Sequence, residues 1–207
     1  VYPQRIDDEL IELLASEERV CPYLDVPFQH CSEKVLKLMG RKGNKNEYLS
    51  LVQKMRDSVP NMVIRTTFLV GHPGEGEEEF NELKSFVEEA KFEWLGVFPY
   101  SPEENTPSFE MENRPPLAEA MKRAEEIELL YRAARQSSAF GIGSVKEALV
   151  IDDVDDILVC RSMSEAPEVD GVILARKEGS APSLGEITKL KLLGIDELDF
   201  TAQLIGS

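Results

Sequence analysis

The sequence is poor in cysteine, and it has no long apolar run. Its three cysteines, Cys21, Cys31 and Cys160, are odd in number and far apart among 207 residues, which argues against a disulfide framework and favours a reducing cytoplasm. No stretch approaches the roughly 20 apolar residues of a membrane-spanning helix, and the first residues, Val-Tyr-Pro-Gln-Arg-Ile-Asp-Asp, do not resemble a signal peptide. We therefore expect a cytoplasmic protein without membrane contact.

Positive charge is also scarce. The chain has 23 Lys/Arg against 39 Asp/Glu, a formal net charge of −16, and residues 139–207 alone hold 6 against 13. A nucleic-acid-binding face normally needs a surplus of cations to neutralise phosphates. The acidic balance therefore favours a basic protein partner. A charge that only keeps the protein soluble is the alternative.

Residues 1–138 alternate between apolar strand patterns and amphipathic helix patterns. This order predicts a parallel sheet covered by helices, the α/β class. The long loop 101–116, rich in proline and acid, has the length of a functional lid or a linker. The expected strands are 21–28, 62–70 and 94–100, and the expected helices are 7–16, 33–39, 46–59, 77–90 and 117–136.

Residues 139–207 have a different character. Short apolar stretches near 145–151, 156–161, 171–176, 186–193 and 198–205 are separated by glycine, proline and aspartate. Five short strands at this spacing predict a small antiparallel β-barrel of the OB kind. We therefore expect two domains, 1–138 and 139–207.

The run at 64–80, Ile-Arg-Thr-Thr-Phe-Leu-Val-Gly-His-Pro-Gly-Glu-Gly-Glu-Glu-Glu-Phe, is the most informative segment. It predicts a buried strand, a glycine turn and a helix start, in which backbone can approach a ligand closely. Ligands of parallel α/β folds bind at this edge of the sheet. An ordinary strand-to-helix turn remains the alternative.

Four motifs in one order resemble the radical S-adenosylmethionine (SAM) methylthiotransferases. They are Tyr-Leu-Asp-Val-Pro-Phe-Gln-His at 23–30, the run at 64–80, Gly-Val-Phe-Pro-Tyr-Ser-Pro-Glu-Glu-Asn-Thr-Pro at 96–107 and Ala-Pro-Glu-Val-Asp-Gly at 166–171. The first and last favour the branch that methylthiolates an aspartate of a basic small-subunit ribosomal protein. Cys31 and Asn105 depart from the usual residues at their positions.

This resemblance implies a fold and two kinds of cofactor. The first domain would be the C-terminal portion of a radical SAM, TIM-like α/β barrel, and the second would be a TRAM domain. The complete enzyme would use SAM and two 4Fe-4S clusters, one of them held by Cys-x3-Cys-x2-Cys. No such run occurs in this chain, so we expect no metal ligands here and no activity of this chain alone.

The resemblance also implies a cofactor pocket. Arg65, in the middle of its strand, would bind a carboxylate of SAM or an active-site acid, or else form a structural ion pair. His30 would contact the cofactor or the target aspartate, or else be a buried structural residue. Arg65 and His30 are thus the catalytic candidates. The cofactor-binding candidates are Arg65, Gln29, Gly71, Pro73, Gly74, Phe98 and Tyr100.

In the second domain, Glu165, Glu168 and Asp170 form an acidic cluster. This cluster could hold a Lys/Arg-rich loop of the ribosomal protein, or could be a solvated turn. RNA binding through the TRAM domain is disfavoured by the acidic charge. The alternatives are a tRNA adenosine methylthiotransferase and a non-catalytic TRAM binding module.

Overall fold

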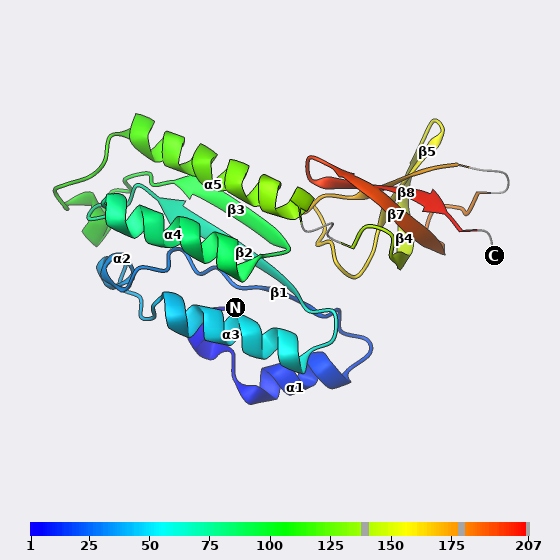
Figure 1. The fold of residues 1–207 in the computed structure, drawn as a ribbon, viewed down its shortest axis with the longest axis horizontal. Coiled ribbons are helices and arrows are strands. Elements are labelled where there is room, and N and C mark those ends of the chain that lie inside the picture. The colour runs from blue at the N-terminus through cyan, green and yellow to red at the C-terminus, as the bar shows by residue number, and fades with distance from the viewer. Residues whose placement is uncertain (138–140, 178–180, 206–207) are drawn as a thin grey trace. The chain divides into compact units, whose positions relative to one another are not determined.

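The computed structural model describes all residues except 138–140, 178–180 and 206–207. Its internal contacts divide the chain into two compact units, Val1–Ala134 and Arg135–Ser207, which are drawn together in Figure 1 and are described here one at a time. Residues 138–140, around the predicted domain boundary, lie outside the described part. No helix among the described residues is both long and apolar enough to cross a membrane.

The first unit alternates helices and strands along the chain, as the sequence predicts. Its strands are β1 (Tyr23–Asp25), β2 (Val63–Val70) and β3 (Trp94–Pro99). Its helical elements are η1 (Pro3–Arg5), α1 (Asp8–Ser16), α2 (Glu33–Leu38), α3 (Lys45–Ser58), α4 (Glu77–Ala90), η2 (Pro107–Phe109) and α5 (Leu117–Ser137).

Short polar side chains begin two of the helices. The Asp7 carboxylate accepts a hydrogen bond from the Leu10 N–H (2.9 Å) at the start of α1, and Asn44 accepts one from the Glu47 N–H (3.0 Å) at the start of α3. Such caps satisfy N–H groups that have no partner within the helix. They fix where α1 and α3 begin.

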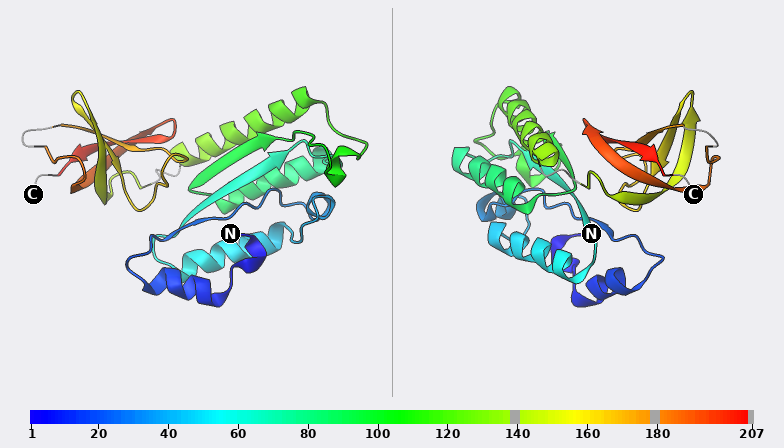
Figure 2. Two further views of the ribbon diagram at one scale, coloured as in Figure 1. Left: turned by 180° about the vertical axis from the view of Figure 1, so that it is seen from behind. Right: turned by 45° about the vertical axis from the view of Figure 1, so that its right-hand side comes forward.

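The three strands form a parallel sheet in the order β1-β2-β3. In β2, Ile64, Thr66, Phe68 and Val70 are buried, whereas Arg65, Thr67 and Leu69, which alternate with them, are only partly buried. Because successive side chains of a strand point to opposite faces, one face of the sheet is the core and the other is open. Helix α4 lies in front of the strands in Figure 1 and behind them in the left view of Figure 2.

An aromatic cluster fills the core face. Phe28 contacts the rings of Tyr48 in α3 (centroids 4.6 Å apart), Phe86 in α4 (5.6 Å) and Phe92 (5.7 Å), and Phe68 of β2 lies 5.9 Å from Phe86. Aromatic side chains bury large apolar areas and favour tilted or edge-to-face pairs. This cluster binds the helical layer to one face of the sheet and leaves the other face available.

The second unit is a closed barrel of five strands in the order β4-β5-β6-β8-β7. The predicted five strands and OB-like barrel are confirmed. The predicted antiparallel arrangement needs one correction, because β6 and β8 pair in parallel and the barrel is therefore mixed. The bounds are β4 (Val145–Val154), β5 (Ile157–Arg161), β6 (Ile173–Arg176), β7 (Ile187–Asp196) and β8 (Asp199–Leu204).

Candidate functional site

The open face of the sheet presents a cationic side chain on β2. Arg65 donates through Nη1 to the Asp25 carboxylate on β1 (3.2 Å) and to the Thr67 hydroxyl (3.4 Å). Its side chain retains 16% of its accessible surface, so the guanidinium is largely enclosed but still reachable. Gly96 on β3 lies beside it, since a Cβ added there would be 3.8 Å from Arg65 Nη2. Its strand neighbours Ile64 and Thr66 are buried on the opposite face.

Phe98 lies on the same face, one strand away. Its register partner is Leu69, and its side chain is exposed. Arg65 and Phe98 both lie beside Gly96, so this face combines a flat apolar surface with a cation, as small-molecule sites commonly do.

Gln29 marks the carboxyl end of the β1 segment. It adopts a left-handed backbone conformation (φ 68°). Its N–H donates to the Thr67 carbonyl (2.9 Å) and its carbonyl accepts from the Leu69 N–H (2.8 Å). We use "rim" for the edge that Gln29 shares with the loop 71–76, which follows β2. Gln29 is partly buried, and its backbone ties the two strand ends together at the rim.

The glycines of the loop serve the packing of the chain's own helices. Gly71 (φ 79°) lies so close to α5 that an added Cβ would be 2.3 Å from the Ala120 Cβ, and Gly74 (φ 89°) would meet Leu38 Cδ1 at 2.4 Å. Only glycine adopts such backbone conformations without strain. The sequence predicts that these glycines let a ligand approach the backbone. In the structure, α5 packs against Gly71 and the end of α2 packs against Gly74. Pro73 lies between them, and its carbonyl contacts His72 Nδ1 (2.9 Å).

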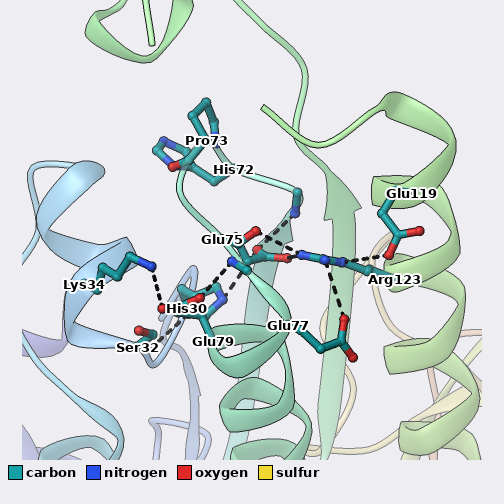
Figure 3. Close-up of polar contacts among 12 residues, drawn as sticks. His30, Ser32, Lys34, His72, Pro73, Glu75, Glu77, Glu79, Glu119 and Arg123 are labelled. Carbon is teal, nitrogen blue, oxygen red and sulfur yellow. Dashed lines mark hydrogen bonds and ion pairs between the residues drawn. The ribbon is translucent and has the colours of Figure 1, made fainter. Parts of the chain in front are cut away.

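A buried polar cluster brings together Glu75 of this loop, His30 and Arg123 (Figure 3). Arg123 of α5 donates through Nη1 to Glu75 Oε1 (2.7 Å) and to the Glu75 carbonyl (3.2 Å). Glu75 Oε2 accepts from the Gly71 N–H (3.0 Å) and faces His30 Nε2 at 3.5 Å. The side chains of His30 and Glu75 have no accessible surface, and that of Arg123 has 8%. The cluster therefore joins the end of β1, the loop and α5.

The hydrogen bond to Nδ1 assigns the tautomer of His30. The Ser32 N–H donates to His30 Nδ1 (2.9 Å), so the proton of the neutral ring is on Nε2 and points at Glu75. His30 is fully buried, so a direct contact with a cofactor has no support in this geometry. The contact predicted for it stays a prediction, and the structure shows His30 as an internal partner of Glu75.

Glu75 is charged within this cluster. Burial alone raises the pKa of its carboxyl group, but the nearby His30 ring and the hydrogen bonds from Arg123 and the Gly71 N–H outweigh burial and hold the pKa below its usual value. Around the cluster, Glu119 accepts from Arg123 Nε (3.2 Å), and Lys34 donates to Glu79 (2.6 Å) at the start of α4. Neither Glu75 nor Arg123 is among the predicted site residues, because nothing in the local sequence marks Arg123 as a buried partner.

Tyr100 lies below the surface next to His72. The two ring centroids are 5.2 Å apart, and Arg114 lies over the Tyr100 ring at 5.6 Å. Burial lowers the pKa of His72, and its ring packs as a structural neighbour of Tyr100. Tyr100 retains 6% of its surface, so of the two predicted aromatic contacts with a cofactor only Phe98 is exposed.

The cysteines do not fit an iron–sulfur cluster. Cys21 is exposed, whereas Cys31 and Cys160 are buried, and burial raises the pKa of the Cys160 thiol to about 11. Thiolate ligands require the opposite shift. Among the described residues, no group of three His, Cys, Asp or Glu side chains could hold a metal ion. Within the described part of the chain, the three cysteines therefore lie apart from any shared metal site.

The three acidic residues of the second unit have different environments. Glu165 is buried, and its carboxylate accepts from the Ser162 N–H and hydroxyl (both 2.7 Å). Asp170 accepts from the Ala166 N–H (2.8 Å). Glu168 is exposed, in a left-handed backbone conformation (φ 68°). Glu165 and Asp170 thus hold a turn that displays Glu168, and the predicted acidic contact surface is reduced mainly to Glu168.

Comparison with known proteins gives two domain matches. Residues 3–87 match the Radical SAM superfamily, and residues 142–205 match the TRAM domain. A similar fold occurs in coproporphyrinogen III oxidase (HemN) from Escherichia coli, a radical SAM enzyme, with a TM-score of 0.55 at 17% identity over 65% of this chain and 31% of that chain. This likeness concerns the fold alone. The predicted radical SAM and TRAM domains are confirmed.

Curated relatives are similar over nearly the whole chain. The ribosomal protein uS12 methylthiotransferase RimO of Thermodesulfovibrio yellowstonii is 41% identical over 92% of this chain and 45% of its own length. That of Pelotomaculum thermopropionicum is 40% identical over 99% of this chain and 47% of its own length. The chain therefore spans about half the length of these relatives. The predicted resemblance to the radical SAM methylthiotransferases is confirmed.

Proposed function

We propose that this chain is part of a ribosomal protein methylthiotransferase. It joins a radical SAM segment to a TRAM domain, and it is similar to RimO over nearly all its residues. The complete enzyme would convert an aspartate of uS12, the small-subunit protein in the relatives' name, to 3-methylthioaspartate. This chain would supply one wall of the SAM pocket and the TRAM domain. Its site of action would be the cytoplasm, where ribosomal proteins are made.

The observation that supports this proposal best is the position of Arg65. A guanidinium on the open face of a parallel sheet, held by Asp25 at 3.2 Å and retaining 16% of its surface, is suited to bind a carboxylate. Arg65 would hold the carboxylate of SAM, and Phe98 would offer its ring to the adenine. Bound SAM supplies a radical and a methyl group, and the protein orients the reactants.

The TRAM domain would dock the substrate protein. Its turn displays Glu168, and residues 139–207 carry more than twice as many acidic as basic residues. Like-charge repulsion disfavours an RNA backbone, whereas a basic ribosomal protein is attracted. Binding of a tRNA is the alternative, and the acidic charge of residues 139–207 speaks against it.

The proposal is tested by replacing Arg65 in the complete natural protein with its clusters. Arg65→Ala removes a charge-assisted hydrogen bond worth about 1.5–3 kcal/mol, so we expect SAM to bind at least about tenfold more weakly. Binding is measured by equilibrium dialysis with labelled SAM, and folding by the thermal midpoint.

Asp25→Ala is the matched control. It removes the partner of Arg65 but leaves the guanidinium on the open face. If Arg65 contacts SAM, only Arg65→Ala weakens binding strongly. If Arg65 forms only a structural ion pair, both variants shift the thermal midpoint alike and neither changes SAM affinity, and the proposed role of this face is then abandoned.

A further inference from the structure

Three parts of the first unit that are distant in sequence meet at one buried carboxylate. Glu75 is bonded to the Gly71 N–H at the end of β2 (3.0 Å) and to Arg123 on α5 (2.7 Å), and it faces His30 Nε2 at the end of β1 (3.5 Å). Its side chain has no accessible surface. A buried carboxylate is costly to maintain unless such partners surround it, so any movement of one partner is opposed by the others.

Each contact of Glu75 restricts the position of one part of the rim. Gly71 follows directly after Val70, the last residue of β2, so a fixed Gly71 N–H fixes where the loop leaves the strand. His30 follows Gln29, whose carbonyl and N–H are bonded to β2, so the orientation of the His30 ring is coupled to the backbone of Gln29. Figure 3 shows His30 and Arg123 reaching Glu75 from opposite sides.

The geometry points to Glu75 as a positioning residue for the SAM site: it touches no cofactor, but it holds the ends of β1 and β2 and helix α5 in the one arrangement that shapes the rim. This inference rests on the proposed function, because it assumes that SAM binds at the rim and along the open face. His30 belongs to the same cluster: its ring faces Glu75 and its backbone follows Gln29, so a fixed ring restricts the backbone of Gln29.

Glu75→Gln is the informative variant. The amide has nearly the same shape, but it lacks the charge that Arg123 and the Nε2–H of His30 both favour. We expect the loop to loosen, SAM affinity of the complete protein to fall about tenfold, and hydrogen exchange at the Gly71 amide to become at least tenfold faster. Equilibrium dialysis with labelled SAM measures the affinity, and two-dimensional NMR of this chain measures the exchange.

Glu93→Gln is the matched control at the other end of the strands. Glu93 is a largely buried carboxylate that also pairs with an arginine, Arg56 (3.0 Å), and accepts a strand N–H, that of Ile64 (2.8 Å). It precedes β3 and thus lies at the amino ends of the strands. Both variants should lower the thermal midpoint, but only Glu75→Gln should weaken SAM binding and expose the Gly71 amide.

The outcomes separate this inference from the function on which it rests. If the wild-type protein binds SAM and Glu75→Gln binds it equally well, the positioning role is wrong and the proposed function stands. If both variants weaken SAM binding equally, Glu75 contributes only general stability, and the positioning role is again wrong. If the wild-type protein does not bind SAM, the proposed function fails, and the positioning role fails with it.

Discussion

Tyr100 illustrates how the surroundings of one residue can differ from what its type suggests. The sequence makes Tyr100 a candidate cofactor-binding residue, but in the structure it is buried against His72. Its hydroxyl oxygen finds no hydrogen-bond partner among the described residues. An unsatisfied buried hydroxyl costs about 1–3 kcal/mol of folding free energy, whereas the hydroxyl of Tyr131 donates to the Glu93 carbonyl at 2.7 Å.

We predict that Tyr100→Phe leaves the free energy of unfolding unchanged or raises it by about 1 kcal/mol, because it removes a hydroxyl without a partner. Tyr131→Phe should lower it by about 1 kcal/mol, because a hydrogen bond is lost. Urea denaturation followed by circular dichroism compares the two variants. Equal losses in both would mean that Tyr100 has a partner such as a bound water molecule.

For single residues, the sequence predicts which face of an element a side chain lies on better than it predicts which partners that side chain contacts. The side of β2 from which Arg65 projects follows from strand alternation, which is a local rule. The partners of Glu75 could not be predicted in this way, since Arg123 is 48 residues away and occurs in an otherwise ordinary amphipathic helix. The burial of His30 and Glu165 likewise depends on contacts that only the folded chain brings together.

Helix α5 and the loop 71–76 form a closely fitted pair of elements. At Gly71 both the left-handed backbone and the close approach of Ala120 exclude a side chain. The sequence predicts both elements, because the glycine turn and the helical periodicity are local signals. It does not predict that the glycine serves helix packing.

We predict that Gly71→Ala destabilises the protein by about 2–5 kcal/mol, since strain at positive φ and overpacking add. Gly40→Ala is the control: it has a similar φ of 70°, but nothing lies within 4 Å of the added Cβ, so only about 1–2 kcal/mol is lost. Thermal unfolding of both variants is the measurement. Equal losses would mean that the approach of α5 to Gly71 contributes nothing.

The predicted element bounds were accurate where a signal is local. The helix expected at 77–90 is found at Glu77–Ala90, because acidic residues and a glycine mark its start. The strand expected at 21–28 is shorter, Tyr23–Asp25. Pro22 and Pro27 cannot donate to a ladder, and the left-handed Gln29 ends the regular pattern. Strand order and the parallel β6–β8 pair depend on non-local pairing and were not predicted.

At the scale of the whole molecule, charge is the dominant property. The net charge of −16 gives a field that attracts a basic partner and repels a phosphate backbone. Because mobile ions screen such fields within about 8–10 Å at physiological salt, an electrostatic docking mode has a clear signature in its salt dependence.

We predict that purified uS12 binds the complete protein more weakly as salt is raised, and that Glu168→Lys weakens binding by roughly two- to fivefold, the effect of an exposed charge. Glu12→Lys, an equally exposed acid on α1, should have little effect. Titration calorimetry at two salt concentrations measures both. If Glu168→Lys binds as wild type does, or if a tRNA displaces uS12, the acidic docking surface is wrong.

The two sheets of the chain differ in how they end. The barrel of the second unit is closed, so each of its strands has a neighbour on both sides. In the first unit, β1 and β3 stand at the borders of a three-stranded sheet, and within the described residues each has a strand partner on one side only. The unpaired N–H and C=O groups of an edge strand can form hydrogen bonds with strands of other chains. During synthesis or purification of this chain, self-association and aggregation should therefore begin at Tyr23–Asp25 and Trp94–Pro99, while the barrel stays monomeric.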